Sequence, residues 1–174
     1  VTCFVSKDFD TDSLGTFSGE IARKDDALTT LRKKCLEGMQ SEGFDLAIAT
    51  EGSFGNHPTV FFAPANDELI MLVDQKNNLE IVERVLSMDT NFDSSEIHTK
   101  EELKAFLDKV QFPSHAVIMK NTAENWTKIY KGITDYDSVV KIYDEIVVSS
   151  NSCFIETDMR AMFNPTRIRI IKEV

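Results

Sequence analysis

The sequence predicts an α/β protein with a mixed β-sheet flanked by helices. Helix-like and strand-like segments alternate near both ends of the chain, and a meander of strand-like segments lies between them. The length of 174 residues favours a single domain spanning residues 1–174, and an apolar content of 42% is sufficient for a hydrophobic core.

In the first third of the chain, a helix is expected between Asp26 and Gly43. Its apolar residues recur at spacings of three and four, Asp25 and Asp26 complement its amino end, and Gly43 is a candidate C-cap. A short strand is expected at 2–5 and a buried strand at 45–50.

The middle of the chain predicts further strands. Residues 59–63 form a short apolar run that ends at Pro64. Residues 68–74 and 79–88 are separated by the turn-forming segment Gln75-Lys-Asn-Asn78, which predicts a hairpin, and 87–95 is expected to be a polar loop.

The last part of the chain again alternates helices and strands. Thr99 and Glu102 form a capping-box pattern that opens a helix to Val110, and Asp135 is expected to cap a second helix. The remaining segments are expected to be strands at 115–119, 126–131 and 152–157, and a final helix over 168–174 with Pro165 near its first turn.

Composition excludes several functional classes. A net charge of −10 leaves no excess of cations for broad binding to nucleic acid. The three cysteines are widely spaced, which argues against a disulfide framework or a zinc site, and no apolar run is long enough to span a membrane. We therefore expect a cytoplasmic protein that binds neither nucleic acid nor membrane.

Three polar clusters are candidates for a functional site, 8–20, 51–57 and 156–167, and 89–91 is a fourth, weaker one. The middle one, within Glu51-Gly-Ser-Phe-Gly-Asn-His-Pro58, follows a predicted strand, where α/β sheets commonly bind ligands. The last one contains Arg160 and Arg167, whose guanidinium groups suit phosphate or carboxylate. Two alternatives stay open: the middle cluster is a simple turn, and the arginines pair internally with Glu156 or Asp158.

These clusters resemble an uncharacterised bacterial family of unknown function. The resemblance rests on Asp10-Thr-Asp12 with Gly15-Thr-Phe-Ser-Gly-Glu20, on Glu51-Gly-Ser-Phe-Gly-Asn-His-Pro58, and on Thr157-Asp-Met-Arg-Ala161 with Asn164-Pro-Thr-Arg167. It covers almost the whole chain and implies that flanking family segments are missing at one or both ends.

The order of loop, helix, strand and acidic motif is also distantly similar to the inosine triphosphate pyrophosphatase superfold. That similarity implies that Glu20 and Glu51 hold Mg²⁺ and that Ser53, with the backbone amides of 52–55, faces a phosphate or base. It is an analogy at the level of fold.

The resulting expectation is a metal-dependent hydrolase of a nucleotide or other phosphorylated small molecule, with Mg²⁺ as cofactor. The alternative is a non-catalytic module that binds an anion or nucleotide, or a scaffold domain; a homodimer is compatible with each. The expected site residues are, as catalytic groups, Glu51, His57 and Asp158; as ligand-binding groups, Gly15, Thr16, Arg23, Ser53, Arg160, Asn164 and Arg167; and as metal ligands, Glu20 and Glu51.

Overall fold

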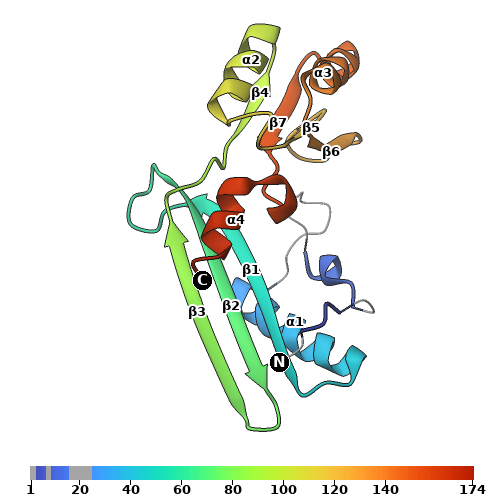
Figure 1. Ribbon diagram of the computed structural model, residues 1–174. Coiled ribbons are helices and arrows are strands. Elements are labelled where there is room, and N and C mark those ends of the chain that lie inside the picture. The colour runs from blue at the N-terminus through green and yellow to red at the C-terminus, as the bar shows by residue number, and fades with distance from the viewer. Residues whose placement is uncertain (1–2, 7–8, 16–24) are drawn as a thin grey trace. The chain divides into compact units, whose positions relative to one another are not determined.

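The computed structural model describes residues 3–6, 9–15 and 25–174 (Figure 1). Over these residues it confirms the α/β class, with four α-helices and seven strands. The elements are α1 (Ala27–Glu42), β1 (Leu46–Asn56), β2 (Pro64–Asp74), β3 (Leu79–Ser87), β4 (Ser94–Ile97), α2 (Lys100–Lys109), β5 (Val117–Lys120), β6 (Ile129–Ile133), α3 (Tyr136–Ser150), β7 (Cys153–Thr157) and α4 (Pro165–Ile171), with short 3-10 helices at Thr11–Leu14 and Ala161–Phe163.

The strands form two antiparallel sheets, and the chain groups into two compact units. The first unit contains the described residues up to Phe54 together with 66–87 and 170–174, and the second contains 55–65 and 88–169. None of the helices in the described part of the chain is long and apolar enough to cross a bilayer.

The first unit is a three-stranded sheet with strand order β1-β2-β3, covered on one face by α1. Asp26 caps α1 by accepting from the amide of Thr29, and Gly43 ends it in a left-handed conformation with φ 71°. The core between helix and sheet is aliphatic and sulfur-rich. Its buried members are Leu31, Cys35, Met39, Leu69, Met71 and Val73.

The second unit is a four-stranded sheet with order β4-β7-β5-β6. Both β4 and β5 pair antiparallel with β7, so they run parallel to each other and need the long connection through α2. The same argument explains why α3 joins β6 to β7. The core cluster draws residues from both helices and from alternate positions of the strands, including Val117, Met119, Cys153 and Ile155, so α2 and α3 cover the same face.

Several local predictions hold. The capping box of Thr99 and Glu102 opens α2, Asp135 caps α3 by accepting from the amide of Ser138, and β2 and β3 form the expected hairpin. The predicted edge strand at 126–131 corresponds to β6, which instead spans Ile129–Ile133 and does lie at a sheet edge.

Other local predictions are wrong. β1 does not stop at residue 50 but continues to Asn56, so most of the middle polar cluster is strand and not turn. Residues 59–63 are not a strand, Pro64 begins β2, and β4 lies at the end of the expected polar loop. Residues 3–5 are not a strand, whereas Thr2 lies outside the described residues. Pairing with neighbouring strands outweighs the turn preference of glycine, serine and aspartate here.

Candidate functional site

The best-defined polar group in the second unit is the pair of Asp158 and Arg160, just after β7. The Arg160 Nε lies 2.9 Å from one carboxylate oxygen of Asp158, and Nη2 lies 2.6 Å from the other. This is a bidentate, charge-assisted arrangement. The side chain of Asp158 is 0% exposed whereas that of Arg160 is 28% exposed, so the carboxylate is the inner partner and the guanidinium the outer one.

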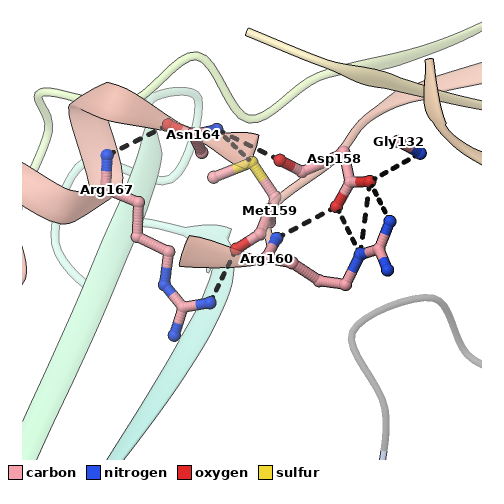
Figure 2. Close-up of polar contacts among 6 residues, drawn as sticks. All are labelled: Gly132, Asp158, Met159, Arg160, Asn164 and Arg167. Atoms are coloured by element: carbon pink, nitrogen blue, oxygen red, sulfur yellow. Dashed lines mark hydrogen bonds and ion pairs between the residues drawn. The ribbon is translucent and has the colours of Figure 1, made fainter. Parts of the chain in front are cut away.

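Two backbone amides complete the environment of Asp158 (Figure 2). The amide of Arg160 donates to Oδ1 at 3.1 Å, and the amide of Gly132 in β6 donates to Oδ2 at 3.0 Å. The carboxylate therefore accepts hydrogen bonds on both oxygens. It is a fully engaged group that fixes the orientation of Arg160.

Phe163 forms a second support for Arg160. The guanidinium carbon lies 4.5 Å from the centroid of the Phe163 ring, within the range of a cation–π contact. The same ring packs on the backbone of Gly132, where a Cβ atom would lie 2.8 Å from the ring. Gly132 also has a φ of 68°, which L side chains rarely adopt, so both sterics and conformation require glycine there.

Asn164 organises the segment that follows. Its Oδ1 accepts from the amide of Arg167 at 3.0 Å, as an N-cap does, and its Nδ2 donates to Oδ1 of Asn91 at 2.8 Å. The buried guanidinium of Arg167 donates from Nη1 to the carbonyl of Met159 at 2.6 Å. The structure thus brings Asp158, Arg160, Asn164 and Arg167 into one connected network, as Figure 2 shows.

The alternative that the arginines pair internally is confirmed for Arg160, which pairs with Asp158. Glu156 was the other acidic partner considered, and it has a different partner. Glu156 pairs instead with Lys120 of the neighbouring strand β5, at 2.7 Å. Burial raises the pKa of the Glu156 carboxyl, and the hydrogen bond from Lys120 opposes that rise. No spacing in the sequence connects these two residues, which meet only because β5 pairs with β7.

In the first unit, Glu51 is buried in β1 and lies 2.5 Å from Nζ of Lys34 in α1. Lys34 also donates to the carbonyl of Thr50 at 3.4 Å. Ser53 is half-buried farther along β1, and Gly15 follows the first 3-10 helix with φ 132°. Thr16, Glu20 and Arg23 lie outside the described residues.

His57 holds a loop together. It follows β1, and its Nδ1 accepts from the amides of Thr59 at 3.2 Å and Val60 at 3.1 Å. Because Nδ1 accepts two hydrogen bonds, the proton of the neutral ring resides on Nε2. This geometry gives the histidine that we expected to be catalytic a clear part in closing the loop between β1 and β2.

The expected metal ligands can be tested only in part. Among the residues that the structure describes, no three His, Cys, Asp or Glu side chains are grouped as a metal site requires. Glu51 has a lysine ammonium beside it, which competes with a divalent cation for the same carboxylate. The other expected ligand, Glu20, lies outside the described residues, so the expected pair of metal ligands stays a prediction.

A groove of about 430 Å³ lies beside the network in the second unit. It follows β6 from Ile129 to Ile133 and the first turn of α3, where Ser138 and Ile142 contribute to its lining. Gly132 belongs both to this groove and to the partners of Asp158. The groove and the Asp158–Arg160 pair are therefore adjacent.

His115 is a buried histidine of the same unit. Its Nε2 lies 2.9 Å from Oγ1 of Thr166 and accepts from the amide of Thr166 at 3.3 Å. Burial lowers the pKa of its imidazole below the ordinary value of 6.5. The neutral ring therefore stabilises the junction between β5 and α4.

We expect the free energy of unfolding to fall as the pH drops from 7.5 to 5.5. A histidine whose pKa is lower in the folded state leaves the unfolded chain binding more protons below about pH 6.5, so acid favours unfolding. Urea unfolding at both pH values measures the effect. His115→Gln should show a smaller difference between the two pH values than the unmodified protein; an equal difference would show that His115 is not responsible.

Sequence reasoning missed Gly132 and Phe163 in the second unit and Lys34 in the first. Gly132 directly follows the predicted strand 126–131, and glycine at a strand often marks a close approach of another group. Phe163 and Lys34 had no signal that could be recognised, since each meets its partner through tertiary packing.

Comparison with known proteins gives a family but no activity. No curated protein and no solved structure matches the chain. A family model described as a domain of unknown function, DUF6671, matches residues 34–174, which include the middle and last polar clusters. The chain therefore belongs to the DUF6671 family.

Proposed function

We propose that the protein binds a small phosphorylated molecule through Arg160 and that this binding needs no metal ion. The observation that carries the proposal is the orientation of Arg160 by a carboxylate that is itself 0% exposed. A guanidinium that is fixed before binding loses less conformational entropy when an anion arrives.

The surroundings of Arg160 support this assignment. Its planar group rests on Phe163, and the open groove along β6 and α3 shares Gly132 with the partners of Asp158, so it can receive the uncharged part of a ligand. Lys131 also lines this groove and adds a second cation. In this proposal Asp158, first expected to be catalytic, is a positioning residue for Arg160.

Asp158 also limits the affinity. It compensates much of the charge of Arg160, so the site offers directed hydrogen bonds more than a strong positive potential. Phosphate esters suit such a site because their oxygens accept hydrogen bonds in a planar, paired geometry. A dissociation constant in the micromolar to millimolar range is the consequence, which corresponds to about −4 to −8 kcal/mol.

A thermal-shift and calorimetric screen tests the proposal. The probes are inorganic phosphate, ribose 5-phosphate, AMP and ATP, each with and without EDTA. We expect at least one probe to stabilise the protein, by about 2.7 kcal/mol at a hundredfold excess over its dissociation constant, with no effect of EDTA.

Two variants make the screen specific. Arg160→Lys keeps the charge but loses the planar fork, and should weaken binding by about tenfold. Arg169→Lys is the matched control, because Arg169 also forms an ion pair with an aspartate, Asp89, and is exposed. The proposal is rejected when no probe binds, or when the control loses as much affinity as Arg160→Lys.

A Mg²⁺-dependent hydrolase of a similar molecule is a second candidate. It is favoured by the burial of the Glu51 carboxylate in β1, and it requires that Mg²⁺ displace the ammonium of Lys34 from that carboxylate. Glu51 and Glu20 are the ligands that such an enzyme needs. Phosphate release from ATP with Mg²⁺ or Mn²⁺, abolished in Glu51→Gln, is the expected signature; absence of turnover in the unmodified protein excludes this candidate.

A further inference from the structure

β3 is an exposed edge strand in which five of the nine residues are apolar. It is nine residues long, Leu79-Glu-Ile-Val-Glu-Arg-Val-Leu-Ser87, and it pairs with β2 on one side only among the described elements. Figure 1 shows it at the outer side of the first sheet. Ile81 is 53% exposed, Val82 38% and Leu86 37%. Long apolar edges of this kind favour pairing with another strand.

The sheet face away from α1 extends this apolar surface. Ala47, Ala49 and Met71 pack toward the helix core, so the alternate residues of each strand point to the other face. The register of β2 with β3 places Ile81 beside Leu72 on that face. The exposed apolar residues there are Leu46, Ile48, Leu79 and Ile81.

We propose that β3 pairs antiparallel with β3 of a second copy of the chain, with Val82 on the two-fold axis. The two three-stranded sheets then form one six-stranded sheet. The backbone amides and carbonyls at the outer edge of each β3 form hydrogen bonds with those of the other β3. The same type of antiparallel pairing joins β2 to β3 within one copy.

The positions of the charged residues in β3 favour a second copy as the partner and favour this register. In a symmetric antiparallel pair, residues on the same face must lie opposite each other, so the axis passes through a residue. With Val82 on the axis, Glu80 lies opposite Arg84 of the other copy, and this happens twice. In this register Ile81 lies opposite Glu83. Shifting the axis to Glu83 places two carboxylates opposite each other, and shifting it to Ile81 leaves Glu80, Glu83 and Arg84 without an opposite charge across the pair.

The charges at this edge are already held in place within one copy. Nε of Arg32 lies 2.8 Å from Glu80, and Nε of Arg84 lies 2.7 Å from Asp67. Pairing in the proposed register joins Arg32 and Glu80 of one copy to Arg84 and Asp67 of the other, which gives a row of four charges with alternating sign. Leu79 and Val85 of the two copies meet on the opposite face.

Cysteine cross-linking reads the register directly. Directly opposite Cα atoms in antiparallel strands lie about 4.5–5.5 Å apart, which a disulfide can bridge. In a Cys3→Ser background, which removes the exposed native cysteine, Val82→Cys should form a disulfide-linked dimer under mild oxidation. Leu86→Cys is the matched control, because Leu86 shares the face and exposure of Val82 but would lie about 26 Å from its own copy.

Sedimentation velocity of the Cys3→Ser protein provides the second readout and needs no cross-link. We expect a dimer at a concentration of about 100 μM, in the range of moderate affinities. The proposal is overturned by a monomer at that concentration, or by a Leu86→Cys protein that cross-links as readily as Val82→Cys. Neither readout depends on binding of a phosphorylated ligand.

Discussion

Arg160→Ala is expected to lower the free energy of unfolding by about 3 kcal/mol. The reason is the position of its partner: Asp158 is 0% exposed and keeps only the two backbone amides when the guanidinium is removed. A buried carboxylate without a cation carries an uncompensated desolvation cost. Urea unfolding followed by the fluorescence of Trp126, the single tryptophan, measures the change.

Removing the other partner, Asp158, is expected to cost less stability. Asp158→Ala leaves the guanidinium of Arg160 with access to water and leaves the amide of Gly132 without its acceptor, so we expect a loss of about 2 kcal/mol. The double variant should lose less than the sum of the two single variants, because it removes both charges together. Strict additivity would show that the two side chains do not interact in solution.

The sequence predicted the helices because their signals are local. α2 and α3 carry apolar periodicity and a side-chain cap within one segment, so Thr99 and Asp135 mark their first turns without knowledge of the rest of the chain. β1 was cut short because Gly52, Ser53 and Gly55 are turn formers in isolation. Their strand conformation depends on pairing with β2, and this pairing cannot be predicted from the residues next to them in the sequence.

In the candidate site, too, the contacts between residues close in sequence could be predicted and those between distant residues could not. Asp158 and Arg160 are two residues apart, so their pairing could be proposed from the sequence alone, whereas the partner of Glu156 is Lys120, in another strand. A family of unknown function is shown over residues 34–174, whereas the motifs on which the resemblance rested stay a prediction, and the Asp10–Glu20 motif lies outside the matched range. The likeness to the inosine triphosphate pyrophosphatase superfold stays a prediction, since no solved structure matches.

Gly132→Ala is the second large prediction, with an expected loss of about 3 kcal/mol. Part comes from the left-handed backbone, which costs an alanine about 1–2 kcal/mol, and part from overlap with the Phe163 ring, where the new Cβ would lie only 2.8 Å away. Gly38→Ala is the matched control with the opposite sign. Gly38 lies within α1 with no atom within 4 Å of an added Cβ, so alanine there should stabilise by about 0.5–1 kcal/mol.

The two glycine variants also separate stability from binding. Gly132 supports Arg160 in two ways. Its amide donates a hydrogen bond to Asp158, and its backbone packs against the Phe163 ring that contacts the guanidinium. Displacing the ring should therefore weaken phosphate-ester binding as well as folding, and adding Phe163→Leu should recover part of the stability without recovering the affinity. Gly38→Ala should bind as the unmodified protein does. Full affinity in Gly132→Ala, measured well below its unfolding temperature, would mean that the orientation of Arg160 does not matter for the ligand.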